Sequence, residues 1–396
     1  MKKRSATNKQ APQAAQAVAE KLVPYRSRAK AERDFLRFAS FEINNFRCFD
    51  SFELSPLSLV NLITGMNGVG KTAILEALFL HVGATNPTCA LRVNLWRGLG
   101  GVGEWTGMLW RTLFWQFKTT DPIRFVRTDS RGKKSTLAIT MAPSAAAVTK
   151  DMTADMGFEF AKDLGRDLVL EYEDEKGQVS TVRGIPEIVK KGDVVQFGLK
   201  VEPPLAQTPF PGIFLNSWRQ GLAEEEVQRF SDLRISKQDE MVLDVLKRME
   251  PRLEKLEILS PHGASMIYGH LRGYNEPVPL SLLGDGVRRV TSLVLAIGSA
   301  RGGTLLVDEV ENGIHHSVMP SLWEAIGRAV DLFHTQVIAT THSLECVSAA
   351  YEAFSRRRSY DLTLHRVDRV DGMVRAIAYD RESLEGALSL PTEVRG

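Results

Sequence analysis

The chain has 396 residues, 43% of them hydrophobic, so it is long enough for two or three domains with a sizeable core. Its net charge of +2 neither requires nor excludes a nucleic-acid partner. The three cysteines, Cys48, Cys89 and Cys346, lack the spacing of a metal site and favour a reducing compartment, so we expect a cytoplasmic protein. No apolar run reaches the length of a membrane span, and Met1–Arg4 is not followed by the apolar core of a signal peptide.

Residues 1–36 differ in composition from the rest of the chain. They are rich in Ala and Gln, and basic residues outnumber acidic ones. This composition is typical of a flexible, solvated arm. A nucleic-acid-binding or partner-binding arm is the alternative.

The segment Gly65–Thr72 matches the phosphate-loop pattern G-x-x-x-x-G-K-[ST]. A β-rich run, 58–64, precedes it, and 72–80 has the apolar spacing of a helix, which is the context that this motif needs. Lys71 is expected to reach the β- and γ-phosphates of ATP, and the Thr72 hydroxyl to bind Mg²⁺. The backbone of the loop and the positive end of the helix would cradle the phosphates, with these loop residues contributing: Asn67, Gly68 and Gly70.

The chain around and after this loop alternates between β-like and helical patterns. Residues 85–120 contain four tryptophans, Trp96, Trp105, Trp110 and Trp115, which either stack on nucleic-acid bases or pack a subdomain. Residues 221–255 are expected to be helical. Residues 41–43 and 52–54 alternate like strands. Further strand patterns at 123–126, 137–140, 168–172 and 194–197 predict an antiparallel sheet with excursions.

A second group of polar residues follows apolar strands in the C-terminal third. The run 304–309 ends in Asp308, which is placed to hold Mg²⁺, and Glu309, which is placed to polarise the attacking water. Glu311 competes with Glu309 for the role of base, because the local sequence is Asp-Glu-Val-Glu. The run 336–343 contains His342 at its end, where a histidine can contact the γ-phosphate.

A glycine-flanked turn stands before the apolar helix 290–297. It contains Gly284, Asp285 and Gly286, and a turn of this kind at a helix start is an anion site. Because the chain already has one phosphate loop, this second site is expected to serve the nucleotide of a second subunit.

In their order, these motifs resemble the ABC-type ATPase heads of the RecF/SMC group, and most closely the overcoming-lysogenization-defect (OLD)-like ATPases. Asn44–Phe49 resembles the N-terminal NFR.F element, Leu283–Gly286 the signature motif, and Asn312–His316 the D-loop. Asp308-Glu309 resembles Walker B with its catalytic glutamate, and His342 the switch histidine. The resemblance covers about 38–90 and 255–396.

The resemblance implies an α/β fold: an ABC-type P-loop NTPase head with an antiparallel β subdomain and a helical insertion. The implied parts are a flexible arm (1–36), an N-lobe (37–90), a β and helical insertion (91–254) and a C-lobe (255–396). Two heads would sandwich two ATP molecules, giving a homodimer or higher oligomer. Arg47 would lie near the base or α-phosphate, or would be a salt-bridged strand residue.

Two features depart from relatives of this kind. Asp285 stands where transporters have SGGQ, which argues against a transporter subunit. No Q-loop is obvious, and Gln116 is a weak candidate.

The chain ends about fifty residues after His342, in a predicted hairpin at 362–367 and 373–379, so we expect no Toprim nuclease. Three functions remain open. They are an antiphage sensor or scaffold for a separate nuclease or toxin effector, a RecF-like DNA-repair ATPase, and a housekeeping ATPase or GTPase acting alone.

Overall fold

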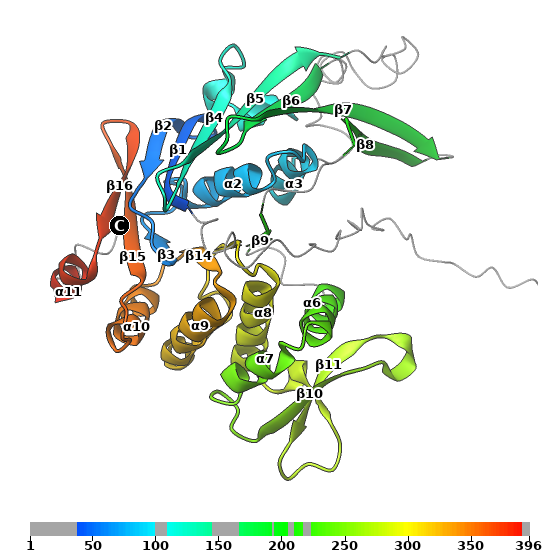
Figure 1. Cartoon of the computed structure of the whole chain (residues 1–396), viewed down its shortest axis with the longest axis vertical. Coiled ribbons are helices and arrows are strands. Elements are labelled where there is room, and N and C mark those ends of the chain that lie inside the picture. The colour runs from blue at the N-terminus through cyan, green and yellow to red at the C-terminus, as the bar shows by residue number, and fades with distance from the viewer. Residues whose placement is uncertain are drawn as a thin grey trace, which may run out of the picture.

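A computed structural model describes residues 38–99, 109–144, 166–191, 194–204, 210–216 and 223–389. The basic arm at 1–36 and Trp105 lie outside these ranges. Figure 1 shows a layered α/β molecule in which helices separate and cover two large sheets.

The first large sheet has seven antiparallel strands in the order β2-β1-β4-β5-β6-β7-β8. Buried and more exposed side chains alternate along β4, so one face of the sheet packs on the core. The sheet joins β1 and β2 to strands beyond residue 120, and therefore runs across the expected boundary at residue 90. Its strands are β1 (Phe38–Phe46), β2 (Phe49–Leu54), β4 (Ile123–Asp129), β5 (Lys134–Pro143), β6 (Arg166–Glu173), β7 (Val179–Lys191) and β8 (Val194–Glu202).

The second large sheet forms the centre of the molecule, in the order β16-β15-β3-β14-β13-β9. Its strands pair in parallel except for the terminal β15–β16 hairpin. Leu305 and Val307 face one core while Leu306 between them faces the other, so both faces are covered and the strand is apolar throughout. The strands are β3 (Val60–Thr64), β9 (Gly212–Leu215), β13 (Thr304–Val307), β14 (Gln336–Thr340), β15 (Leu362–Val370) and β16 (Met373–Tyr379).

Helices cover both faces of the parallel sheet (Figure 1). On one face, α2 (Lys71–Val82) is nearly all buried, because it is packed between the two large sheets. On the other face lie α8 (Asp285–Ser299), α9 (Met319–Phe333) and α10 (Leu344–Ser355), each with a buried apolar stripe. The remaining helices are α3 (Thr88–Trp96), α6 (Ala223–Ile235), α7 (Asp239–Leu246) and α11 (Arg381–Ser389).

A small third sheet lies beyond α6 and α7 (Figure 1). It contains β10 (Leu253–Leu259), β11 (Met266–Leu271) and β12 (Val278–Pro279) in antiparallel order. The chain then passes through a single 3₁₀ turn, Leu280–Leu282, directly into α8. The small sheet therefore stands immediately before the predicted signature turn.

The predicted fold class is confirmed: an α/β head with a phosphate loop, an antiparallel β subdomain and a helical region between its halves. The expected closing hairpin is β15–β16. The region 221–255, expected to be helical, contains α6 and α7, but its last residues begin β10. Within the described ranges, no helix combines the length and apolar character needed to cross a membrane.

Candidate nucleotide site

The phosphate loop connects β3 to α2, as its sequence predicts. A Cβ at Gly65 would collide with the backbone of Val367, and one at Gly70 would lie 2.7 Å from Cys48 Sγ. Both glycines have positive φ, 139° and 113°. By contrast, a Cβ at Gly68 would meet nothing within 4 Å, so the middle of the loop is open to a ligand.

Lys71, the first residue of α2, folds back over the loop. Its Nζ donates hydrogen bonds to the carbonyl oxygens of Gly65 and Met66, at 2.6 and 2.9 Å. Burial lowers the pKa of this ammonium group to about 8, against the opposing effect of Asp308 and of two glutamates nearby. The loop thus holds a buried cation at the place where the phosphates of a nucleotide would lie.

Asp308 follows β13 and meets the phosphate loop. Both carboxylate oxygens lie 3.2 Å from Thr72 Oγ1, and Thr340 Oγ1 donates to Oδ1 at 2.7 Å. Hydroxyl and carboxylate oxygens are the hard donors that Mg²⁺ prefers, so the residues present fit that ion. The pairing of β3, β14 and β13 in parallel explains the convergence, because their carboxyl ends share one edge.

Glu309 is held in an unusual backbone conformation, with φ at 49°. Its N–H donates to Thr340 Oγ1 at 2.8 Å, so Thr340 links the backbone of Glu309 to the carboxylate of Asp308. The Glu309 carboxylate lies 3.6 Å from His342 Nε2, and both side chains are more than a third exposed. Glu309 and His342 therefore face the same accessible space beside the loop.

Glu311 is used differently. Its Oε1 accepts a hydrogen bond at 2.7 Å from the backbone N–H of His342. Its Oε2 is buried and has no hydrogen-bond partner in the structure. Glu311 therefore fixes the backbone of the segment that carries His342, whereas Glu309 contacts the side chain.

Sequence reasoning missed Thr340. Its hydroxyl is fully buried and bridges two predicted site residues, which makes it a positioning residue for both. The available signal was the pair Thr340-Thr341 at the end of an apolar strand. Thr341 continues the connection, since its N–H donates to the carbonyl of Ile63 on the strand before the phosphate loop.

Arg47 occupies the salt-bridged position that was the alternative to a nucleotide contact. Its Nε lies 3.2 Å from Glu76, its Nη1 donates to the Thr112 carbonyl at 3.0 Å, and its Nη2 to Asn94 at 2.8 Å. Burial lowers the pKa of Arg47, and Glu76 opposes that effect. With three nitrogens in use, this guanidinium ties α2 to α3 and to the segment around Thr112.

Gln116 is exposed and has a positive φ of 47°. Its segment packs on the turn between β1 and β2, where the Arg47 N–H donates to the carbonyl of Leu113. The same turn carries Cys48, which abuts Gly70 of the phosphate loop. The β1–β2 turn thus lies between the segment of Gln116 and the phosphate loop. The role of Gln116 as the Q-loop residue stays a prediction.

The predicted signature turn begins α8. Gly284 has φ 96° and would tolerate a Cβ sterically, while Asp285 is exposed. At Gly286 a Cβ would lie 3.2 Å from Val318 Cγ1, in the segment that follows Walker B. Arg289, one turn further along, donates to the Glu309 carbonyl at 3.5 Å. The turn therefore lies beside the segment that follows Walker B in its own chain, and the space next to Gly284 is open.

Two of the four tryptophans in residues 85–120 have clear packing roles. Trp110 is fully buried, and Trp96 packs against Phe79 and Phe214. These two rings belong to the core. Packing of a subdomain is therefore what the structure shows for them, in place of a surface for stacking bases.

Comparison with known proteins agrees with this geometry. Residues 60–348 match a family model described as "AAA domain, putative AbiEii toxin, Type IV TA system". An ATP/GTP phosphatase of Helicobacter pylori is 22% identical over 331 residues, covering 78% of this chain and 86% of the relative. RecF of Xanthomonas oryzae pv. oryzae is 55% identical over 38 residues, a tenth of each chain.

The SMC head domain of Thermotoga maritima aligns over 87% of this chain and all of its own, at 13% identity and a TM-score of 0.42. The family match confirms the prediction of a P-loop ATPase, whereas the OLD-like subtype stays a prediction. Because the family model spans well over half of the sequence, the chain belongs to this family of AAA ATPase domains.

Proposed function

We propose that this chain is a Mg²⁺-dependent ATPase, and that ATP pairs two copies of it through their heads. The observation that carries the proposal is the connected set Thr72, Asp308, Thr340 and Glu309, which joins the phosphate loop to the Walker B strand. An ATP/GTP phosphatase as a relative supports nucleotide hydrolysis as the reaction.

Each site residue has a role in this proposal. Lys71 binds the β- and γ-phosphates. Thr72 and Asp308 would hold Mg²⁺, which when bound would neutralise charge on the phosphate oxygens. Glu309 accepts a proton from the water that attacks the γ-phosphorus, and the products are ADP and phosphate. His342 contacts the γ-phosphate.

Pairing of heads completes the site. The signature turn, Gly284 to Gly286, would bind the γ-phosphate held by the partner's phosphate loop, because its backbone N–H groups begin a helix. The open space beside Gly284, where a Cβ would meet nothing within 4 Å, supports this role. Hydrolysis removes the γ-phosphate that both heads contact, and the two heads then separate.

We further propose that this switch acts as a cytoplasmic sensor or scaffold for a separate effector, a nuclease or toxin, in antiphage defence, as in OLD-like ATPases. The family description, which names a putative toxin and a Type IV TA system, supports a role connected with a toxin.

The experiment is a tagged Glu309→Gln pull-down from the native host in ATP, with mass spectrometry of the retained proteins. A nuclease or toxin that is retained by Glu309→Gln and absent with Lys71→Ala supports the proposal. Equal recovery of the same proteins with both variants would contradict it, because binding would then not depend on nucleotide.

A RecF-like DNA-repair ATPase is the second candidate, favoured by the RecF match over 38 residues. It predicts ATPase activity that duplex DNA stimulates, with an effect that falls steeply with salt. A flat response to duplex DNA at low salt would exclude it.

A further inference from the structure

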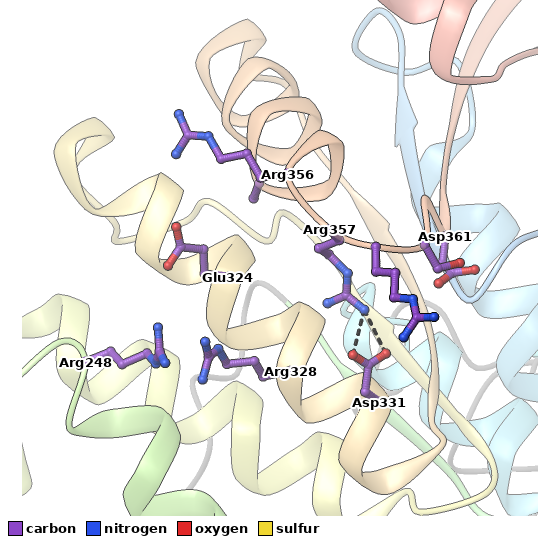
Figure 2. A pocket seen from close by; sticks show the side chains of 10 residues that line it. Arg248, Glu324, Arg328, Asp331, Arg356, Arg357 and Asp361 are labelled. Carbon is purple, nitrogen blue, oxygen red and sulfur yellow. Dashed lines mark hydrogen bonds and ion pairs between the residues drawn. The ribbon is translucent and has the colours of Figure 1, made fainter.

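An arginine-rich hollow of about 690 Å³ lies on the helical face of the parallel sheet. It is lined by parts of three elements: the end of α7, the exposed side of α9 and the segment that follows α10 (Figure 2). Its charged lining residues are Arg248, Arg328, Arg356, Arg357, Arg358, Glu324, Asp331 and Asp361. Five arginines against three carboxylates leave a local excess of two positive charges.

The hollow is separate from the nucleotide site. Asp331 is near the end of α9, and Asp361 directly precedes β15, so both lie toward the amino-terminal edge of the parallel strands. Lys71 and Asp308 lie at the carboxyl edge of the same sheet. A five-residue strand spans roughly 16 Å, which separates the two edges.

One arginine of the hollow is firmly fixed. Arg357 makes a two-pronged ion pair with Asp331, at 2.7 and 2.8 Å, and lies over the ring of Phe354 at 4.9 Å. Its guanidinium crosses α9 at Gly327, where a Cβ would collide with it. Glycine is less favourable than alanine within a helix, but only glycine leaves room for the arginine at this position.

Two other arginines, Arg248 and Arg328, have no partner of opposite charge among the residues that the structure describes. Figure 2 shows Arg248 at the end of α7 and Arg328 on α9 with their guanidinium groups turned toward one another. Neither they nor Arg358 forms an ion pair in the described part of the chain. Like charges that face one another repel, and an anion placed between them would remove that repulsion.

From this arrangement we propose that the hollow is a binding site for phosphate groups, held between Arg248 and Arg328 with Arg358 at its edge. The lining contains arginine and no lysine, and the planar guanidinium donates two parallel hydrogen bonds to phosphate oxygens. The volume is within the range of small-molecule sites. The phosphates belong either to a phosphorylated small molecule or to a nucleic-acid backbone.

The test uses the full chain carrying Lys71→Ala, so that the phosphate loop does not bind the probes. Inorganic tripolyphosphate is titrated by calorimetry, and a short fluorescent DNA duplex by anisotropy, at low salt. The site variant is Arg248→Ala with Arg328→Ala. The control is Arg234→Ala, which removes an exposed arginine without an ion pair at the end of α6.

We expect the double variant to weaken binding roughly tenfold or more, since each charged hydrogen bond contributes about 1.5–3 kcal/mol, and the control to leave it unchanged. Loss for tripolyphosphate alone identifies a small phosphorylated ligand, and loss for the duplex alone identifies a nucleic-acid backbone. If neither probe binds, or binding is indifferent to the double variant, the proposal is overturned. The result does not depend on the proposed ATPase function, because all proteins in the test lack Lys71.

Discussion

Two glutamates stand two residues apart after β13, and their surroundings separate their roles. One carboxylate oxygen of Glu311 accepts a hydrogen bond from the backbone N–H of His342. Glu309 is bent outward by its positive φ and has its carboxylate beside the His342 ring. A base must reach water in the site, and only the second arrangement leaves a carboxylate accessible for that purpose.

Exchanging each glutamate for glutamine therefore tests the assignment. Glu309→Gln should lower kcat by at least about a hundredfold while ATP binding persists, because the loss falls on the proton-accepting group. Glu311→Gln should retain most of the activity, since an amide oxygen still accepts the hydrogen bond from the His342 N–H. Steady-state phosphate release measures both, and the opposite ranking would make Glu311 the base.

The buried ammonium of Lys71 predicts a pH dependence of nucleotide binding. Its pKa of about 8 means that the free protein loses this positive charge as the pH rises through 8. ATP affinity should be constant below about pH 7 and fall between pH 7 and 9. Fluorescent-ATP titration at several pH values measures this, and Lys71→Arg is the control because arginine stays charged. An equal decline in both proteins would assign the effect to another group.

His365 predicts a stability change in acid. Its ring is fully buried in β15 and has no hydrogen-bond partner among the described residues, and burial lowers its pKa from 6.5 to about 4. The fold favours the neutral ring, so the associated stability is complete above pH 6.5 and declines as the pH falls toward 4. The decline amounts to roughly 3 kcal/mol.

Urea unfolding at pH 7 and pH 4.5 measures the effect. His365→Leu should show a smaller difference between the two pH values than the parent protein, and His334→Asn, an exposed site with φ 52°, should show the same difference. An unchanged pH dependence in His365→Leu would indicate that other groups, such as the buried His81, dominate.

At the scale of elements, one side chain joins the two large sheets. Gln336 begins β14, where its Oε1 accepts from the Phe38 N–H at 2.7 Å. Its Nε2 donates to the carbonyls of Phe38 and Ser58, at 2.7 and 2.8 Å. The first strand of the antiparallel sheet is thus attached to the centre of the parallel sheet through a buried amide.

Replacing this amide with an apolar side chain should be costly. Gln336→Leu removes this partner from the buried N–H and carbonyl of Phe38, while the Ser58 carbonyl keeps its hydrogen bond from Asn61. Each unpaired group costs about 1–3 kcal/mol. We expect a loss of roughly 2–5 kcal/mol in the free energy of unfolding, measured in urea. Gln228→Leu, at an exposed position of α6, is the control and should change stability by less than about 0.5 kcal/mol.

The elements differ in how far the sequence determines them. Local sequence patterns predict the strand, glycine loop and helix around Lys71. They also predict the apolar strands that end at Asp308 and Thr340. The position of β9 does not, because its four residues become a strand by pairing with β13, some ninety residues away. The partners of Arg47 were equally hidden, since they come from three separate segments.

At the scale of the whole molecule, the proposed site has two parts. The phosphate loop and Walker B meet through Thr72 and Asp308, whereas a Cβ at Gly286 of the predicted signature turn would lie beside Val318, in the segment that follows Walker B. In the proposed dimer, the signature turn of one copy would complete the phosphate site of the other copy.

Gly284 offers a direct test of that expectation. A side chain there meets nothing within 4 Å in the single head, so its effect should be confined to the interface and to the strain of φ 96°. In a Glu309→Gln background, Gly284→Glu should abolish the ATP-dependent dimer, because bulk and negative charge would enter the partner's phosphate site. Light scattering after size exclusion measures mass, and nucleotide titration checks that ATP binding persists.

Gly284→Ala is the matched control, since it introduces the same backbone strain without the charge. A dimer that survives alanine and is lost with glutamate would attribute the contact to the γ-phosphate. Loss with both variants would point to the backbone conformation of the turn, and a dimer that survives glutamate would remove the signature turn from the interface. The comparison thus separates the geometry of the turn from the electrostatics of the phosphate that it is proposed to bind.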